Sequence, residues 1–210
     1  MDKKQVLYFD HAGHQNTQSV INAVRQSVDE LNIKYVVVAS ISGETGVQFW
    51  QALQDTDCQV ISVSVHAGFN GKDDISLSEE KKKEMENEGI KTLITSHALA
   101  GVGRSISNNY GGITDVQLIA DTLKLFGDGM KVAVEVSIMA ADAGLIPTDK
   151  EIIAVGGTSS GADTATVLKA AHMNNFFDLE IREIIAMPRQ KGKWKKLKSK
   201  ALQLQNVLKV

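Results

Sequence analysis

Residues 36–46, VVVASISGETG, join a run of apolar, mostly β-branched residues to a loop of small and hydroxyl-bearing residues. A short continuous apolar run is typical of a strand that is buried on both faces of a sheet. Glu44 follows the loop, and an acidic residue is favoured in the first turn of a helix by the helix dipole. We therefore predict a strand over residues 35–39 and a helix over residues 44–53.

The same alternation of strand and helix continues along the chain. Apolar runs predict further strands at residues 6–9, 60–65, 91–95, 152–155 and 181–186. Helical spacing predicts helices that begin at Asn16 or Thr17 and at Ser78, and others over residues 98–106, 114–126, 131–144 and 162–171. Strands that alternate with helices form a mostly parallel sheet that is covered on both faces. The pattern therefore predicts an α/β fold.

The composition is that of a globular protein with one large domain. The chain has 210 residues, of which 43% are hydrophobic, so it can bury a sizeable core. No apolar run has the length of a membrane span, and the first residues lack the apolar core of a signal peptide. Cys58 is the only cysteine, and we expect a buried, inert thiol. These features predict a cytoplasmic protein.

The charges divide the chain into residues 1–190, a single domain with a net charge of −9, and residues 191–210, a tail with a net charge of +7. An acidic body argues against nucleic-acid binding. In the tail, Trp194, Leu197, Ala201, Leu204 and Leu208 recur at helical spacing. We expect this stripe to pack on the body or on a second subunit of a homo-oligomer, with binding to a membrane surface or a frayed, disordered tail as the alternatives.

Small, polar or imidazole-bearing residues follow five of the predicted strands. These are residues 10–13, 40–45, 66–69, 96–97 and 156–161. Ligands of parallel α/β sheets bind beyond the carboxyl ends of the strands. We therefore expect one polar crevice at that edge, with His66 and His97 as candidate acid and base groups.

The loop over residues 40–45 has the composition of a phosphate site. Glycine lets the backbone approach an anion, and the N–H groups at a helix start point toward it. The loop has neither the Gly-Lys-Ser/Thr of a P-loop nor the Gly-x-Gly-x-x-Gly of a dinucleotide site. Ordinary turn and cap residues would look the same. The sequence GGTSSGADT, residues 156–164, is a second loop of this kind, also followed by a predicted helix.

Other polar residues give weaker signals. His11 and His14 could chelate a metal ion, but no Cys or carboxylate pattern completes a site, so we expect none. Glu135 and Asp142 lie seven residues apart on one face of a predicted helix. They could be paired catalytic carboxylates, although a solvated or salt-bridged helix face is the simpler interpretation.

Several of these segments together resemble a known family. They are YFDHAGHQNT, VVVASISGETG, HAGF, SHALAGVGRSIS, AVEVSIMAADAGLIP and AVGGTSSGADTATV. They are similar to stand-alone proteins related to the pyruvate kinase C-terminal α/β domain, over residues 6–189. The resemblance implies a three-layer α/β/α sandwich with a mostly parallel sheet and an antiparallel edge strand. It also implies flavin mononucleotide (FMN) as a cofactor, because members of the family have been found with it.

The resemblance also implies a role for the 40–45 loop. In pyruvate kinase the matching loop grips a phosphate of the sugar-bisphosphate activator, which carries over to Ser40, Ser42, Gly43 and Thr45. Glu44 stands where that loop often has Arg, which argues against a bisphosphate. The catalytic barrel of pyruvate kinase is absent, so kinase activity is not implied.

The leading hypothesis is that the protein binds a phosphorylated small molecule, FMN first among them. Phe69, Phe176 and Phe177 are the aromatic side chains expected near its ring. The alternatives are an enzyme that acts on a phosphorylated or carbonyl substrate, and a regulatory or scaffold subunit. The candidate ligand-binding residues are Ser40, Ser42, Gly43, Glu44, Thr45, His66, Gly68, Phe69, His97, Gly157, Thr158 and Gly161.

Overall fold

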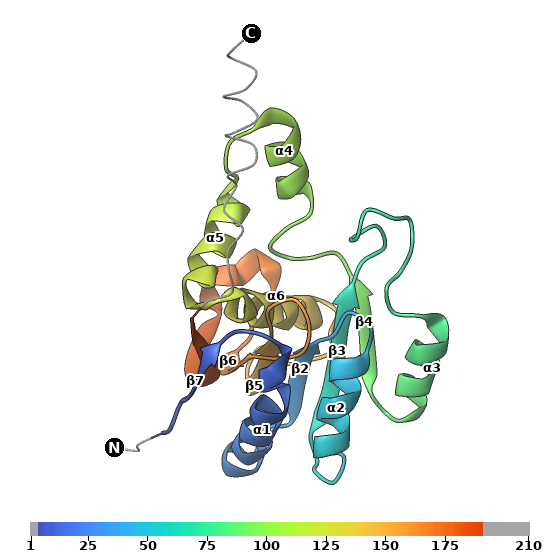
Figure 1. Ribbon diagram of the computed structural model, residues 1–210, viewed down its shortest axis with the longest axis vertical. Helices are drawn as coiled ribbons and strands as arrows, with labels where there is room; N and C mark the ends of the chain where they lie inside the picture. Colours follow the sequence, from blue (N-terminus) through green and yellow to red (C-terminus); the bar gives the residue numbers. More distant parts are fainter. Residues whose placement is uncertain (1–3, 191–210) are drawn as a thin grey trace.

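Seven strands form one sheet in the order β1-β7-β6-β5-β2-β3-β4 (Figure 1). A computed structural model of the chain describes residues 4–190, so the predicted tail helix lies outside the described residues. The strands are β1 (Leu7–His11), β2 (Tyr35–Ala39), β3 (Gln59–Val65), β4 (Lys91–Thr95), β5 (Glu151–Gly156), β6 (Thr164–Lys169) and β7 (Glu180–Gln190). The sheet is therefore one strand wider than the sequence predicted.

Six of the seven strands are parallel. β2 pairs in parallel with β3 on one side and with β5 on the other, so that Val36 lies opposite both Val60 and Ile153. β6 is antiparallel to both of its neighbours, β5 and β7. The expected antiparallel edge strand is thus wrong in its position, because the edges are β1 and β4 and the antiparallel strand lies inside the sheet.

The helix predicted over residues 162–171 is also wrong, because this segment contains β6. Thr164, Thr166 and Val167 are β-branched and suit a strand. The strand is buried from Thr164 to Leu168, so it shows no alternation between apolar and polar positions. A run that is buried on both faces cannot be distinguished from a buried helix by its periodicity. The correction has a functional consequence, since no helix follows the loop over residues 157–161.

Helices cover both faces of the sheet. α1 (Thr17–Leu31), α2 (Glu44–Leu53) and α3 (Glu79–Asn87) lie on one face, and α6 (Asp128–Asp142) lies on the other. The segments between β4 and α6 are α4 (Val102–Tyr110), α5 (Asp115–Leu123) and the 3-10 turn η2 (Lys124–Phe126). Two further 3-10 turns are η1 (His14–Asn16) and η3 (Met173–Asp178). The three layers are those of an α/β/α sandwich.

Alternating residues of the central strands form two separate cores. Val36 and Val38 pack toward α1 and α2, whereas Val37 between them packs toward α6. Phe49 of α2 is fully buried in the first core. Burial of each such side chain contributes about 1.5–3 kcal/mol. The sheet therefore needs apolar residues on both of its faces, which explains the continuous apolar runs in its strands.

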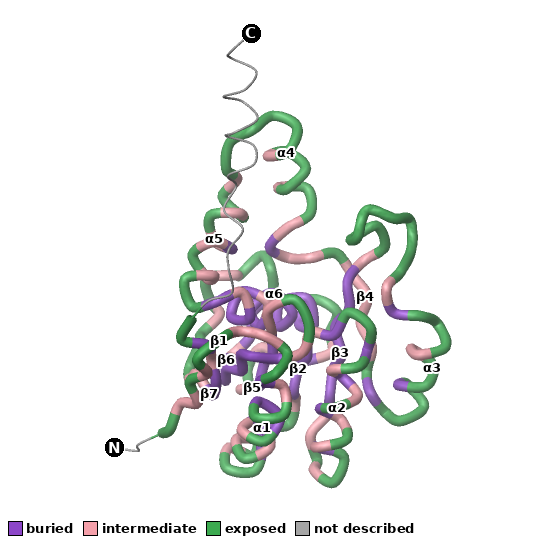
Figure 2. The backbone as a smooth tube through the Cα atoms, viewed as in Figure 1, coloured by how far each residue is buried: buried purple, intermediate pink, exposed green. Residues whose placement is uncertain are grey.

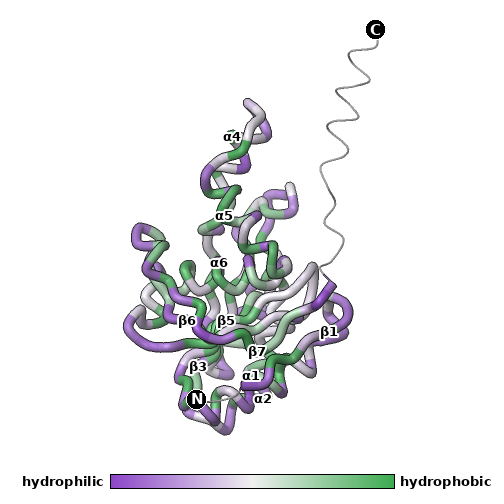
Figure 3. The backbone as a smooth tube through the Cα atoms, turned by 90° about the vertical axis from the view of Figure 1, so that its left-hand side faces the viewer, coloured by the Kyte–Doolittle hydropathy of each residue, from purple (hydrophilic) through white to green (hydrophobic). Residues whose placement is uncertain are grey.

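α4 and the upper part of α5 project from the body of the molecule (Figures 1 and 3). No residue of α4 is buried, as Figure 2 shows. α4 begins at Val102, four residues after the predicted start, because Gly101 has a φ of +71° and the backbone of Leu99 is bonded to Glu135 in the middle of α6. This projecting pair of helices forms one wall of the pocket described below.

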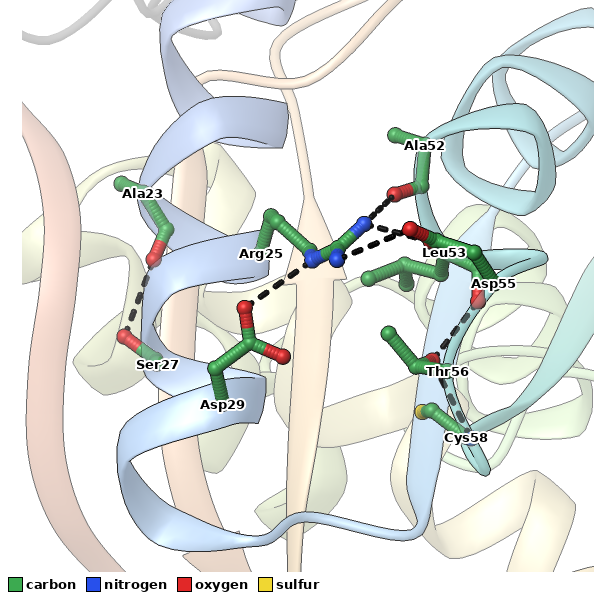
Figure 4. Close-up of polar contacts among 9 residues, drawn as sticks. All are labelled: Ala23, Arg25, Ser27, Asp29, Ala52, Leu53, Asp55, Thr56 and Cys58. Carbon is green, nitrogen blue, oxygen red and sulfur yellow. Dashed lines mark hydrogen bonds and ion pairs between the residues drawn. The ribbon is translucent and has the colours of Figure 1, made fainter.

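Arg25 ties α1 to the end of α2, as Figure 4 shows. Its guanidinium donates to both carboxylate oxygens of Asp55, at 2.6 and 3.1 Å, and to the carbonyl oxygen of Ala52 at 2.8 Å. Its Nε donates to Asp29 at 3.0 Å. Asp55 follows α2 and precedes β3, so these bonds fix the amino edge of the sheet, opposite to the strand ends where ligands bind.

Cys58 lies just before β3, where burial raises the pKa of its thiol to about 12. A thiol with so high a pKa has almost no thiolate at neutral pH and is a poor nucleophile. This agrees with the expected inert thiol. Within residues 4–190, none of the helices combines the length and the apolar character that crossing a membrane requires.

Candidate ligand site at the strand ends

The order in which successive strands are added to the sheet reverses between the parallel neighbours β2 and β5. β2 leads into α2 on one face of the sheet, whereas β5 follows α6 from the other face, and the two strands are neighbours. In open α/β sheets, ligands bind where the carboxyl ends of two such strands diverge. The 40–45 loop follows β2 and the 157–161 loop follows β5. The two loops that the sequence singled out therefore flank this point.

The 40–45 loop is held in place by β3, the strand beside it. The Ser40 backbone N–H donates to the Val63 carbonyl oxygen at 2.9 Å, and Ser64 Oγ donates to the Ile41 carbonyl oxygen at 2.7 Å. Ser40 itself is buried, and its Oγ accepts the N–H of Gly46 at 3.1 Å. Ser40 thus stabilises the loop from inside, while Ser42 and Glu44 are exposed and Thr45 is half-buried.

The first turn of α2 keeps open hydrogen-bond donors. Gly43 is the N-cap residue, and no side chain caps the helix there. The first N–H groups of a helix have no partner within it, and they carry the positive end of its dipole. Ser40 takes the N–H of Gly46, and the N–H groups of Glu44 and Thr45, with the hydroxyls of Ser42 and Thr45 in the same loop, have no side-chain cap. An anion would find donors here.

Gly43 is required by its surroundings. Its φ of +88° lies in the left-handed region that favours glycine. A Cβ at this position would also come within 2.6 Å of Met85 Sδ and 3.0 Å of Leu77, which belong to α3 and the segment before it. Lys81 of α3 passes the same point, where its Cγ would lie 3.4 Å from that Cβ. Sequence reasoning missed Lys81, a cation close to the loop.

The 157–161 loop is anchored by Asp163, which the sequence did not single out. Asp163 is fully buried, and its Oδ2 accepts the N–H groups of Gly13 at 2.9 Å and Thr158 at 3.0 Å. Its Oδ1 accepts the Thr164 hydroxyl at 2.8 Å. The loop after β1 is thereby joined to the loop after β5, across the ends of β7 and β6. Asp163 therefore connects two of the polar loops that the sequence predicted at this edge of the sheet.

Thr158 carries a buried hydroxyl that no residue among 4–190 satisfies by a hydrogen bond. An unsatisfied buried hydroxyl is costly and requires an explanation, such as a ligand or a water molecule. The glycines beside it have structural roles. A Cβ at Gly157 would overlap the Gly161 backbone, and one at Gly161 would overlap Thr17.

Three rings gather at the ends of β3 and β4. The centroids of His66 and His97 lie 5.4 Å apart, and Phe69 lies 5.8 Å from His66 and 4.9 Å from His97. Phe69 is 39% exposed, and Gly68 beside it is exposed with a φ of +78°. The structure thus brings His66, Gly68, Phe69 and His97 together. Phe176 and Phe177 are in η3, where Phe176 packs against the cluster under α5, so they are not part of this group.

Burial lowers the pKa of His97, and the positive charges of Lys131, His66 and Arg104 lower it further, while Glu135 acts in the opposite direction. His97 therefore favours the neutral imidazole. A neutral imidazole can accept a proton or a hydrogen bond from a ligand. The Nδ1 of His66 lies 2.6 Å from the Ala67 carbonyl oxygen, which makes this nitrogen the donor.

Stability should depend on pH through His97. The unfolded chain takes up a proton below the ordinary histidine pKa of about 6.5, whereas the folded protein resists it, so the free energy of unfolding should fall as the pH drops below that value. His97→Gln should flatten this fall by up to about 1.4 kcal/mol per pH unit. Urea denaturation at pH 7 and pH 5.5 measures it, with the exposed His11→Gln as control. Equal pH dependence in parent and His97→Gln would contradict the assignment.

Glu135 and Asp142 are not paired with each other. Glu135 is buried, accepts the N–H of Leu99 at 2.8 Å, and forms an ion pair with Lys131 at 2.5 Å. Asp142 lies 3.0 Å from His172 Nδ1 and accepts the N–H of Met173 at 3.2 Å. The salt-bridged interpretation describes both residues. The buried lysine in this network was missed, since one Lys at the start of an apolar helix carries no signal of its own.

A pocket of about 910 Å³ lies between α4, α5 and the first turns of α6. Its charged lining residues are Arg104, Asp121, Lys124, Asp128 and Lys131. None of the residues in the 40–45 loop lines it, so it is separate from the point between β2 and β5. Among residues 4–190, no group of three or more His, Cys, Asp or Glu side chains is arranged to hold a metal ion.

The family model of the pyruvate kinase alpha/beta domain matches residues 18–169 of the chain. The chain belongs to this family. The match contains the 40–45 loop, the ring cluster and the 157–161 loop, so these parts of the candidate site lie within the matched region. β1 and β7, which widen the sheet beyond β6, lie outside the matched region.

Proposed function

We propose that this pyruvate kinase alpha/beta domain is a cytoplasmic protein that binds a phosphorylated small molecule, with FMN as the leading ligand. The phosphate would lie at the start of α2, against the N–H groups of Glu44 and Thr45 and the hydroxyls of Ser42 and Thr45. The observation that carries the proposal is the uncapped first turn of α2 at the β2–β5 divergence. The unsatisfied hydroxyl of Thr158 on the neighbouring loop supports it.

The ring cluster suits the other end of such a ligand. Neighbouring strands lie about 4.8 Å apart, so the ends of β2 and β4 are about 10 Å apart. A phosphate at the end of β2 and a flat ring against Phe69 and His97 would span that separation. Aromatic side chains favour stacked or edge-on contacts with such a ring. FMN has a phosphate and a flat ring at opposite ends of a flexible chain.

Thr45→Ala should weaken the binding of FMN about tenfold to a hundredfold. Hydrogen bonds to charged groups contribute about 1.5–3 kcal/mol, and the variant removes one hydroxyl donor. Riboflavin lacks the phosphate, so it should bind weakly to the parent and change little in the variant. Calorimetric titration of both ligands tests this.

Thr148→Ala is the matched control, because Thr148 lies before β5 at the opposite edge of the sheet. Gly43→Asp is not a useful variant, since its side chain would collide with Met85 and change the fold as well as the charge. Equal losses for FMN and riboflavin in Thr45→Ala would show that the loop supports the fold and does not grip phosphate.

The pair of imidazoles favours a second candidate, an enzyme that acts on a phosphorylated substrate. His66 and His97 lie side by side, and the fold holds His97 neutral, as a general base requires. If so, His97→Gln should abolish turnover while leaving ligand affinity within a fewfold of the parent. Parallel loss of affinity and turnover would instead favour a binding role.

A further inference from the structure

The pocket between α4, α5 and α6 holds a lysine in an unusual setting. Lys131 is on the first turns of α6, and only 11% of its side chain is exposed. Its carboxylate partner among residues 4–190 is Glu135, at 2.5 Å. A lysine ammonium has three donors, so capacity remains for a group bound in the pocket. The lining of the pocket also includes the apolar residues Leu99, Ala100 and Val132.

Burial lowers the pKa of Lys131, and the positive charges of Lys124 and Arg104 lower it further against the opposing effect of Glu135. Buried lysines beside other cations are the ones that act as nucleophiles toward carbonyl compounds. Lys124 is itself paired with Asp121 at 3.1 Å, and it lies in the same lining.

Arg104 is a second cationic side chain that could bind a ligand in this pocket. It lines the same pocket from α4, is exposed, and its guanidinium forms no hydrogen bond or ion pair within residues 4–190. A guanidinium presents its donors in a planar fork that matches a carboxylate. An unpaired arginine and a buried lysine in one pocket therefore suit a molecule with an anionic end and an electrophilic end.

We propose that this pocket binds a small carbonyl compound bearing a carboxylate, such as a 2-oxo acid or an aldehyde acid, and that Lys131 forms an imine with it. Arg104 holds the carboxylate, and Glu135 moves the proton. The site is separate from the phosphate site on the 40–45 loop, and neither depends on the other.

The step balances without a further reactant. The Lys131 ammonium passes a proton to the Glu135 carboxylate, and the free amine adds to the carbonyl carbon. The oxygen of the resulting carbinolamine takes one proton from the attacking nitrogen and one from the Glu135 carboxylic acid, and it leaves as water as the nitrogen forms a double bond to carbon. The products are a protonated imine, which again faces the Glu135 carboxylate, and one molecule of water. No electron transfer is required.

Reductive trapping tests the proposal on the full-length protein. The protein is incubated with glyoxylate and sodium cyanoborohydride, which reduces an imine to a stable amine, and peptide mass spectrometry measures the rate at each lysine. Lys131 should be modified at least tenfold faster than Lys150, which is exposed and outside the pocket. Lys131→Arg, which keeps the charge opposite Glu135, should abolish the fast modification.

Comparison of glyoxylate with acetaldehyde, an aldehyde without a carboxylate, tests whether Arg104 binds the carboxylate of the ligand. Arg104→Gln should slow trapping of glyoxylate on Lys131 about tenfold and leave trapping of acetaldehyde unchanged, while Lys150→Gln should alter neither. A rate at Lys131 no higher than at Lys150 in the parent protein would overturn the proposal, whether or not any variant folds. Equal slowing of both aldehydes in Arg104→Gln would overturn the role of Arg104. FMN binding is not measured here, so failure would leave the phosphate site unaffected.

Discussion

Glu135→Ala should lower the free energy of unfolding by about 3–5 kcal/mol, the usual cost of leaving one member of a buried ion pair without its partner. Glu135 is 4% exposed and compensates two donors, the ammonium of Lys131 and the N–H of Leu99. After the substitution the lysine must lose its proton or draw in water. Urea denaturation at pH 7 measures the change.

A double substitution separates the contribution of the two charges to stability from the contribution of side-chain packing. Lys131→Met with Glu135→Leu removes both charges and keeps apolar volume, so it should be more stable than Glu135→Ala alone. It should still fall short of the parent, because the buried N–H of Leu99 loses its acceptor, at about 1–3 kcal/mol. A loss below about 1 kcal/mol for Glu135→Ala would contradict the buried ion pair.

Gly156→Ala should be among the most damaging single-methyl substitutions in the chain. Gly156 ends β5 directly beneath α6, and a Cβ there would overlap the carbonyl oxygen of Gly129 and lie 2.9 Å from the Ala133 nitrogen. Both are backbone atoms of α6, so no side chain can turn aside and the helix must shift. We expect a loss of about 3 kcal/mol, at the upper end of the cost of overpacking. Thermal and urea denaturation measure it.

Gly103→Ala is the matched control. Gly103 is inside α4, away from the sheet, and the atoms nearest to its Cβ would be those of the Thr114 side chain, from 3.0 Å. Alanine is favoured over glycine in a helix by about 1 kcal/mol, so stability should be unchanged or slightly higher. If Gly156→Ala were as well tolerated as Gly103→Ala, α6 could not pack as closely on β5 as the structure shows.

Most of the architecture could be predicted from local sequence. α1 shows helical spacing of Val20, Ile21, Val24 and Val28, and these residues are buried in the structure. α6 was recognised although it carries alternating valines, because its apolar run is too long for a strand. Its burial on nearly every side explains the absence of a polar stripe.

β6 could not be predicted for a related reason. Its residues are buried on both faces, and its position between β5 and β7 depends on pairing with segments distant in sequence. The start of α4 was misplaced because the backbone of Leu99 is held by Glu135, which lies 36 residues away in the sequence. Contacts of this range leave no local pattern.

The candidate site was predictable where it is made of loops at strand ends. The loops at residues 40–45 and 157–161, and the rings of His66 and His97, follow directly from the parallel order of the strands. Asp163, Lys81, Lys131 and Arg104 were not predicted, because each acquires its role from partners on another element. Ser40 was correctly associated with the loop, and its hydroxyl is engaged with Gly46 inside it.

Nuclear magnetic resonance tests the central claim most directly. Titration of the ¹⁵N-labelled protein with FMN should shift the backbone N–H signals of Ser42, Gly43, Glu44 and Thr45, along with those around His97, while riboflavin leaves the first four unchanged. That result would place a phosphate at the start of α2. FMN shifts confined to residues outside the 40–45 loop, or identical shifts with riboflavin, would contradict it.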